Sequence, residues 1–425
     1  MAGRSARRSA VMTHVAVLGA GITGVTTAYH LHEAGHEVTV IDRHRYPAME
    51  TSFANGGQLS ASNAEVWTTW ATVLKGLKWM LRRDAPLLVH PVPWWHKVSW
   101  MAEFVSNVGH YRANTLETVR LAVAARPILQ EMAARAGVDY DRSDAGILHF
   151  YDTEPEMEHA RAVTRLYAEA GLHRQELSPA DIARIEPRLA TKPVGGFWTP
   201  SDATGDIHRF TVGVARWLEG QGVTFAMGRE ARDVRALPGG GVTIEGARYD
   251  AVVICAGVGS REVAAKLGDR INVYPVKGYS ITVNLDDAAS REGAPRVSLL
   301  DDAAKIVTSR LGEGRLRVAG TAEFAGLDRD IRDDRIRPLT RWVERHFPEV
   351  ATENVVPWAG LRPMMPSMMP RVGRGRREGV FYNTGHGHLG WTLSAATAQA
   401  VAASVSAAHP PVRRPEAANA RVQAA

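Results

Sequence analysis

Apolar and polar positions near the start of the chain form one recognisable pattern. Residues 14–18 and 37–42 are apolar runs rich in β-branched side chains, and the segment between them has the length and apolar spacing of a helix. Continuous apolar runs of this kind are typical of parallel strands that are buried on both faces. The pattern therefore predicts a strand–helix–strand unit from His14 to Asp42. A similar run from Ala251 to Cys255 predicts another buried strand.

The pattern differs in the rest of the chain. Helical spacing predicts helices over 113–136 and 155–171, whereas short alternation over 272–320, bounded by Gly, Asp and Pro, predicts antiparallel strands. A last strand is expected from Val380 to Asn383, followed by an Ala-rich helix. The fold class is therefore α/β combined with α+β. We expect a Rossmann-type nucleotide-binding domain interleaved with a domain built on a mixed or antiparallel sheet.

Composition and charge narrow the possible partners. The chain has 425 residues, which favours two or three domains. Its formal charge is +6, but six arginines lie in the segments 1–13 and 409–425, which we expect to be flexible. The charge is therefore weak support for a nucleic-acid partner, and we expect none. The single cysteine, Cys255, excludes an internal disulfide and a four-thiolate metal site. No run of about 18 apolar residues is present to cross a bilayer, so a cytoplasmic protein is expected.

A glycine-rich turn follows the first predicted strand. Gly19-Ala20-Gly21-Ile22-Thr23-Gly24 closes the strand and opens the helix, which is the setting that a dinucleotide-binding motif requires. The first glycine allows a tight turn, the second lets the backbone approach a pyrophosphate, and the third allows close packing of helix on strand. Asp42 ends the second strand, where it can accept hydrogen bonds from a ribose, and Arg43 lies beside it.

Three further segments are predicted to contact the same cofactor. A loop rich in Ser, Asn, Gly and Gln follows Asp42, a short segment precedes the strand that ends at Cys255, and a glycine loop follows the last strand. A helix N-terminus at this last loop would stabilise negative charge on a reduced ring. The residues assigned to cofactor binding in these segments are Thr51, Ser52, Asn55, Gly57, Gln58, Val234, Ala256, Gly257, Gly387, His388, Leu389, Gly390, Trp391 and Thr392.

Five motifs, taken in order, resemble those of a known family. GAGITG, ETSFANGGQ, VYPVKGYS, GLRPMMP and NTGHGHLGWT stand at about the family's spacings across residues 14–405. With them the chain resembles the FAD-dependent D-amino acid dehydrogenases of the D-amino acid oxidase and sarcosine oxidase superfamily. One departure is Met365-Pro366-Ser367-Met368, where family members commonly have Thr-Pro-Asp-Gly. This departure bears on the substrate more than on the flavin.

The motifs also divide the chain. The expected Rossmann-type FAD-binding domain is discontinuous, and the insertions between its segments form the substrate-binding domain. The FAD-binding segments are 14–75, 195–272 and 356–408, and the substrate-binding segments are 76–194 and 273–355.

The resemblance implies oxidative deamination of a D-amino acid. Hydride passes from Cα to flavin N5, and the imino acid formed hydrolyses to a 2-oxo acid and ammonia. A membrane quinone or another electron-transfer acceptor takes the electrons. FAD is expected to be held non-covalently, because the only thiol, Cys255, lies in an apolar strand. Two alternatives stay open: an oxidase or dehydrogenase of sarcosine, glycine, D-proline or D-hydroxyproline, and an RNA-associated flavoprotein that uses its basic surface.

Three residues are candidates for the substrate site. Arg362, in the GLRP motif, carries a guanidinium that binds a carboxylate through two hydrogen bonds. Tyr279 is expected to add a phenolic hydrogen bond to the same carboxylate or to close the pocket. His386, in the glycine loop, is the third candidate. A metal site at His386 and His388 would need a third ligand, so we expect no metal.

A tryptophan-rich stretch runs from residue 67 to residue 100. Trp67, Trp70, Leu74, Leu77 and Leu81 recur at helical spacing, with basic residues on another face. The pattern fits an interfacial membrane helix, and it also fits a helix packed on its own domain. Because quinones lie in the bilayer, peripheral contact with the inner face of the cell membrane is a hypothesis to test.

Overall fold

The computed structural model describes residues 12–79, 87–90 and 94–410. The segments 1–13 and 409–425, expected to be flexible, lie outside these ranges except for 12–13 and 409–410.

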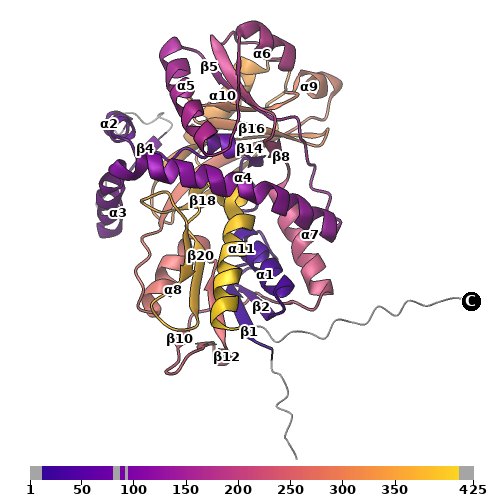
Figure 1. Cartoon of the computed structure of the whole chain (residues 1–425). Helices are drawn as coiled ribbons and strands as arrows, with labels where there is room; N and C mark the ends of the chain where they lie inside the picture. The colour runs from indigo at the N-terminus through magenta and orange to yellow at the C-terminus, as the bar shows by residue number, and fades with distance from the viewer. Residues whose placement is uncertain (1–11, 80–86, 91–93, 411–425) are drawn as a thin grey trace, which may run out of the picture.

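A six-stranded sheet forms the lower part of the molecule in Figure 1. In spatial order it contains β19 (Arg371–Arg374), β20 (Val380–Thr384), β13 (Ala251–Ile254), β1 (His14–Leu18), β2 (Glu37–Asp42) and β9 (Thr224–Met227). All neighbouring strands run parallel except β19 and β20. The chain order reverses at β1, so the loops after β1 and β13 meet at the carboxyl edge of the sheet. This is the place where open α/β sheets bind ligands.

Both faces of this sheet are covered. One face packs on α1 (Ile22–Glu33), α4 (Tyr111–Ala136), α7 (Ile207–Gly220) and α11 (Gly390–Ala408). The other face packs on α8 (Ser260–Lys266) and on a three-stranded antiparallel sheet of β10 (Val234–Ala236), β11 (Val242–Ile244) and β12 (Ala247–Tyr249). Burial on both sides explains why the strand sequences are continuous apolar runs.

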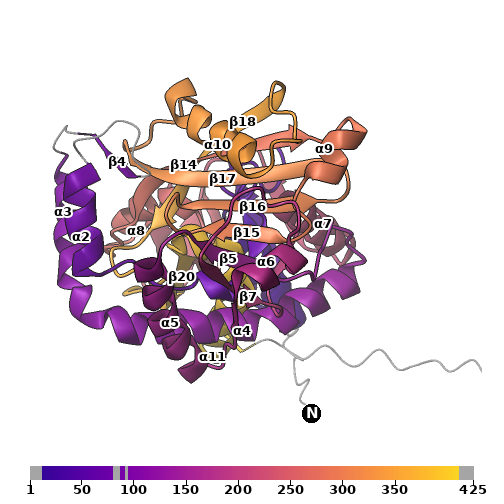
Figure 2. The ribbon, with the colours of Figure 1, turned by 90° about the horizontal axis from the view of Figure 1, so that it is seen from above.

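A larger mixed sheet lies above the first in Figure 1, and Figure 2 shows its strands side by side. In spatial order it contains β18 (Val355–Met364), β14 (Tyr274–Asn284), β17 (Arg315–Phe324), β16 (Ile306–Leu311), β15 (Ser298–Asp301), β5 (Ile147–Tyr151), β7 (Gly195–Thr199) and β6 (Gln175–Leu177), and β4 (Leu87–Val89) pairs with β17. Only the β5–β15 and β4–β17 pairs are parallel. The sequence-based fold class, a Rossmann-type domain joined to a mixed-sheet domain, is confirmed.

The remaining elements include a helix that covers the larger sheet. One of its faces packs on α10 (Asp333–His346), with Tyr279 and Trp342 in the shared core. The other elements are α2 (Trp70–Trp79), α3 (Trp95–Ser106), α5 (Glu154–Glu169), α6 (Pro179–Ile185), α9 (Ala288–Gly293), the ribbon β3 (Gln58–Leu59) with β8 (Ala203–Thr204), and the short 3-10 helices η1 (Ala61–Asn63), η2 (Val108–His110), η3 (Gly257–Gly259) and η4 (Gly387–Leu389).

The two sheets divide the chain at points that differ from the sequence-based boundaries. β7 begins at residue 195 and β18 covers 355–364, segments that we expected in the FAD-binding domain, yet both strands pair within the larger sheet. In addition, α4 comes from the expected substrate-binding domain but packs in the core with α11. Strand pairing joins residues that are distant in the sequence. The positions of the motifs do not indicate which strands pair.

Candidate functional site

A cavity of about 860 Å³ runs between the two sheets. At one end it is lined by the glycine turn after β1, and at the other by β14, β17 and β18 of the larger sheet. A single continuous space therefore connects the predicted nucleotide-binding turn with the predicted substrate residues.

The glycine turn depends on the absence of side chains. Gly19 has a φ of +109°, and a Cβ there would lie 2.5 Å from the carbonyl oxygen of Cys255. A Cβ on Gly24 would overlap the carbonyl oxygen of Gly19. The first and third glycines thus bring β1, β13 and α1 close together, as the motif predicts.

Polar groups surround the start of α1. The Ile22 N–H donates to Ser52 Oγ at 3.0 Å, and the helix has no capping side chain of its own at Gly21. Asp42 accepts two backbone hydrogen bonds, from Ala20 N–H at 2.7 Å and from His44 N–H at 2.8 Å. Its carboxylate is therefore held in place at the cavity wall, with lone pairs left for a ligand.

Arg362 lies at the far end of the cavity. Its Nη1 donates to the carbonyl oxygen of Thr321 at 2.8 Å, and among the described residues no carboxylate pairs with it. Burial lowers the pKa of the Arg362 guanidinium to about 10, so it remains a cation at neutral pH. A Cβ on Gly278 would overlap this guanidinium, which shows how closely it crosses β14.

A β-bulge in β17 presents the carbonyl group to Arg362. Lys277 pairs with Glu323 and Tyr279 with Gly320, so two residues of β17 lie opposite Gly278 alone. One of them, Thr321, has a φ of +59°. Bulges of this kind change the direction of local groups next to active sites. The bulge is a feature that the sequence did not reveal.

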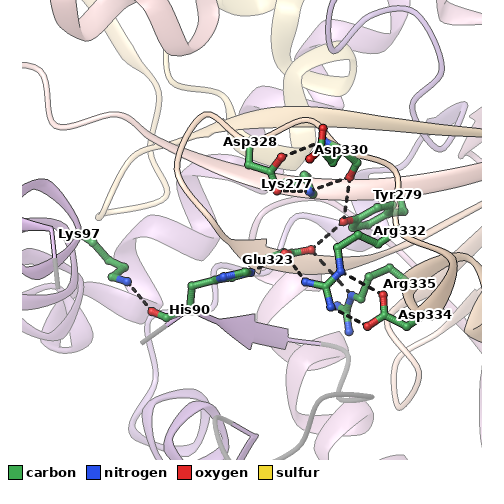
Figure 3. Close-up of polar contacts among 10 residues, drawn as sticks. All are labelled: His90, Lys97, Lys277, Tyr279, Glu323, Asp328, Asp330, Arg332, Asp334 and Arg335. Atoms are coloured by element: carbon green, nitrogen blue, oxygen red, sulfur yellow. Dashed lines mark hydrogen bonds and ion pairs between the residues drawn. The ribbon is translucent and has the colours of Figure 1, made fainter. Parts of the chain in front are cut away.

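The Tyr279 hydroxyl points away from Arg362. It donates to Glu323 Oε2 at 2.8 Å on the face of β14 that α10 covers, and Figure 3 shows it among charged side chains there. Arg362 faces the cavity on the other side, because it pairs with Val276 and side chains alternate along a strand. Tyr279 thus contributes to the cavity wall without directing its hydroxyl to Arg362.

The polar cluster behind Tyr279 is structural. Glu323 is fully buried, and its Oε1 lies 2.6 Å from His90 Nε2 and 3.5 Å from Arg332 Nη1. Lys277, also fully buried, pairs with Asp328 at 2.7 Å. The dashed lines in Figure 3 show these contacts, which tie β4, β14, β17 and the segment before α10 together.

The two histidines of the glycine loop are neutral and point to different partners. His386 Nε2 lies 2.9 Å from Thr397 Oγ1 in α11, and His388 Nε2 lies 3.3 Å from the Asn63 carbonyl oxygen. Burial lowers the pKa of His386 to about 3 and that of His388 to about 4. The His388 ring stacks on Trp67 with centroids 4.6 Å apart.

Most of the residues predicted for the site line the cavity. Ala20 and Gly24 instead support the turn from behind, and Val234 packs in the core beside the three-stranded sheet, whereas Arg229, Glu230 and Arg232 just before it line the cavity. The predicted residues that line it are Gly19, Gly21, Ile22, Thr23, Asp42, Arg43, Thr51, Ser52, Asn55, Gly57, Gln58, Ala256, Gly257, Tyr279, Arg362, His386, Gly387, His388, Leu389, Gly390, Trp391 and Thr392.

Sequence reasoning missed a polar wall between β5 and β16. Asp302 accepts a hydrogen bond from the Tyr151 hydroxyl at 3.1 Å and lies 3.3 Å from Lys305 Nζ. His149 Nδ1 is 3.6 Å from the same carboxylate. These residues line the cavity, but their spacing in the sequence matches no motif. Alternation in the strand that contains His149 and Tyr151 was the only signal available.

A family model of FAD dependent oxidoreductases matches residues 14–404, and the chain belongs to this family. The chain is 60% identical over 404 residues to D-amino acid dehydrogenase 3 of Mesorhizobium japonicum, covering 93% of this chain and 97% of that protein. It is 41% identical to D-amino acid dehydrogenase of Paramagnetospirillum magneticum, covering 92% and 94%. Glycine oxidase from Geobacillus kaustophilus has the same fold, with a TM-score of 0.72 and 21% identity over 93% of this chain and 95% of that one.

The cavity fits the FAD that the family binds. Gly21, the glycine that lets the backbone approach a pyrophosphate, lines the cavity, and within the described chain a Cβ there would meet only Ser52 Oγ, at 3.4 Å. In its walls, six buried polar atoms have no hydrogen-bond partner within the described part of the chain: Gln58 Oε1, Arg174 Nε and Nη2, Thr321 Oγ1, His388 Nδ1 and Trp391 Nε1. Buried polar atoms normally have partners, so these positions indicate a polar ligand. The expected cofactor, FAD, is confirmed by the family.

Proposed function

We propose that the chain is an FAD-dependent D-amino acid dehydrogenase, which converts a D-amino acid to an imino acid that hydrolyses to a 2-oxo acid and ammonia. The observation that carries the proposal is Arg362, a half-buried cation without a carboxylate partner among the described residues, at the end of the FAD cavity. The names of the relatives at 60% and 41% identity support the D-amino acid as the substrate class.

The residues of the cavity divide into two groups in this proposal. Those at the glycine turn, together with Asp42, would hold the adenosine and pyrophosphate, and the loops 51–58 and 385–392 would hold the ring without a covalent bond. FAD, when bound, supplies the acceptor for the two electrons and the hydrogen of the substrate. The family motif also covers 14–404 as one unit, so we propose that both sheets serve one site.

The chain's own residues bind and orient the substrate. Arg362 binds the α-carboxylate and so fixes the position of the Cα–H bond. Lys305 also lines the cavity, but Asp302 at 3.3 Å balances its charge, so loss of water around the bound amine is what would lower the pKa of its ammonium form. The substrate amine can therefore lose its proton without a dedicated base. His386 and His388 are neutral, and they shape the wall.

The test is anaerobic mixing of the holoenzyme with a panel of D- and L-amino acids, sarcosine, glycine and D-proline, followed by the loss of flavin colour. D-amino acids are expected to decolour the flavin. Decolouring by sarcosine, glycine or cyclic imino acids alone would replace the proposal with that alternative. If no amine decolours the flavin, the proposed function is wrong.

We also propose a quinone-type acceptor and peripheral contact with the membrane. α2 and α3 lie side by side in Figures 1 and 2, and they and the residue before α3 expose Trp70, Leu74, Trp94 and Trp95, the last of which is 81% exposed. Aromatic and apolar side chains of this kind bind to membrane interfaces. Among the described residues, no helix is long and apolar enough to span a bilayer.

The tryptophan-rich stretch is more divided than its sequence suggests. α2 begins at Trp70, so Trp67 lies outside the helix and stacks on His388 in the cavity wall. Trp100 is buried, and its Nε1 donates to the Met364 carbonyl oxygen at 2.9 Å. Leu81, and the side chain of Leu77, lie outside the described residues.

The membrane proposal is tested by co-sedimentation with anionic vesicles and by comparing a quinone with oxygen as acceptor. The triple variant Trp70→Ser, Trp94→Ser, Trp95→Ser should bind the vesicles less than the unmodified protein. Val194→Ser with Ile331→Ser, at exposed apolar residues elsewhere, is the control. Equal vesicle binding by both variants, or hydrogen peroxide formed in proportion to substrate, would contradict the proposal.

A further inference from the structure

The loop 54–57 is attached to the larger sheet through three successive carbonyl groups. Each carbonyl accepts a hydrogen bond from a side chain on a different strand. The three bonds run from Ser280 Oγ on β14 to the Ala54 oxygen at 2.8 Å, from Arg317 Nη1 on β17 to the Asn55 oxygen at 3.3 Å, and from Ser309 Oγ on β16 to the Gly56 oxygen at 2.6 Å.

The loop also has no room to move away from its position. A Cβ on Gly56 would lie 2.6 Å from Val307 Cγ2, so the backbone lies directly on β16. Gly57 has a φ of +70°, and its carbonyl accepts from the Gly205 N–H at 2.9 Å. Hydrogen bonds and close packing therefore fix the same few residues.

The direction of the carbonyl groups determines the direction of the N–H groups. In a trans peptide the C=O and the N–H of the next residue point in opposite directions. The carbonyls of Ala54 and Asn55 point to the sheet, so the N–H groups of Asn55 and Gly56 point away from it. Both residues line the cavity, and their N–H groups have no acceptor among the described residues. The Gly57 N–H, by contrast, is bonded to Asn55 Oδ1 at 2.9 Å.

Arg317 adds a charge behind the loop. It is 7% exposed, and no carboxylate of the described residues forms an ion pair with it. Burial lowers the pKa of its guanidinium to about 10, which leaves it charged at neutral pH. Arg317 does not line the cavity, so any effect on a ligand passes through the loop and through its electric field.

We infer that Ser280, Ser309 and Arg317 are positioning residues for FAD: they hold the loop so that the Asn55 and Gly56 N–H groups donate to the bound cofactor. The larger sheet, which binds the substrate through Arg362, thus also sets the environment of the flavin. The inference rests on the proposed contact between residues 51–58 and FAD. It does not depend on which amine is the substrate.

The test uses the holoenzymes of Ser280→Ala and Ser309→Ala. Each change removes one hydrogen bond from the loop, so the affinity for FAD should fall by about fivefold. The fall is measured from the fluorescence of FAD released on dilution, and the visible circular dichroism of the bound flavin should change with it. The reduction potential should become more negative, because donors and positive charge stabilise the reduced ring.

Variants of Arg317 distinguish the effect of its charge from the effect of the loop's position. Arg317→Met should lower the reduction potential more than either serine variant does, and Arg317→Lys should restore most of the difference. Ser290→Ala is the matched control, because Ser290 is equally buried and its Oγ accepts from the Ala351 N–H at 3.0 Å, far from the cavity lining. It should bind FAD as the unmodified protein does.

The inference is overturned if Ser280→Ala and Ser309→Ala retain FAD with unchanged affinity and circular dichroism. The two serines are on different strands, so if one variant does not fold, the other decides. If Ser290→Ala lowers the FAD affinity as much, a general loss of stability explains the effect and the inference is wrong. An inactive substrate panel would overturn the proposed function and leave these FAD readouts valid.

Discussion

Arg362 and Tyr279 come from neighbouring strands of one sheet, but their side chains lie on opposite faces. Arg362 is paired with Val276, whose face is the cavity side, whereas Tyr279 is three residues further along β14 and faces α10. Both residues stand in motifs that sequence comparison recognises. The face that each side chain occupies depends on the strand register and on the bulge in β17, which are set by distant parts of the chain.

Arg362→Ala should raise KM strongly. It removes the only charge proposed for the substrate carboxylate, and loss of a buried charge pair costs roughly 2–5 kcal/mol, or at least about thirtyfold in KM. Steady-state kinetics with a D-amino acid checks this. Arg362→Lys keeps the charge but cannot form two parallel hydrogen bonds to a carboxylate. Its KM should lie between those of the unmodified protein and Arg362→Ala. An unchanged KM with FAD retained would remove Arg362 from the substrate site.

Tyr279→Phe should affect stability rather than substrate binding. The change leaves Glu323 buried with one hydrogen bond fewer, which costs about 1–3 kcal/mol of unfolding free energy. KM should stay within about threefold, a difference of less than 1 kcal/mol, because the hydroxyl faces away from the cavity. Urea unfolding measures the change in stability, and steady-state kinetics measures the change in KM. A large rise in KM at unchanged stability would show that the hydroxyl reaches the substrate.

At the scale of elements, the turn between β18 and β19 differs from the family pattern. Met368 has a φ of +61°, a conformation that glycine adopts easily, and it stands where the family commonly has glycine. Its side chain is 6% exposed, packs near Trp100 and accepts the Trp67 N–H on sulfur at 2.9 Å. The departure seen in the sequence therefore reaches the cavity wall through Trp67.

Met368→Gly should lower stability. Glycine removes about 1–2 kcal/mol of left-handed strain, but loss of a buried methionine side chain costs about 2–5 kcal/mol, so the net loss is about 2 kcal/mol, within a range of about 0–4 kcal/mol. KM should also rise, because Trp67 and its stacked partner His388 lose support. Met368→Leu, which keeps the volume, is the control for packing. Greater stability in Met368→Gly would mean that strain outweighs burial at this turn.

Local elements were predictable to a degree that long-range pairings were not. The predicted helices 113–136 and 155–171 correspond to α4 at 111–136 and α5 at 154–169, because apolar spacing within one helix is a local property. The glycine turn and Arg362 were found from motifs. From the sequence, the nine-stranded sheet was visible only as a run of short strands. Its pairing could not be predicted, because β5 at 147–151 pairs with β15 at 298–301, far along the chain. The polar wall at Asp302 depends on that pairing, so the sequence did not reveal it.

At the scale of the whole molecule, buried histidines make stability depend on pH. Burial holds the pKa of His386 near 3 and that of His388 near 4, below the ordinary 6.5. Above pH 6.5 these two histidines are neutral in the folded and in the unfolded chain. As the pH falls below 6.5 the unfolded chain binds protons that the folded chain does not, so stability is lost.

The expected loss is about 1.4 kcal/mol per pH unit for each histidine between pH 6.5 and about 4. Urea midpoints of the holoenzyme at pH 7, 6 and 5 measure it. His388→Gln should make the slope shallower, while His110→Gln, at an exposed histidine, should not. A midpoint that does not change with pH would contradict the neutral, buried state of these rings.

The strand order of the six-stranded sheet also fixes when the protein can fold. β1 lies between β2 and β13, and β13 lies beside β20, so the sheet joins residues 14–18 to residues 380–384. During synthesis the first strand–helix–strand unit emerges long before β13 and β20. Its apolar faces therefore remain exposed until those strands have been made. Capture of FAD is then expected only after β20 has been synthesised. A chain that stops before β20 is expected to bind no FAD, even though it carries the whole glycine turn.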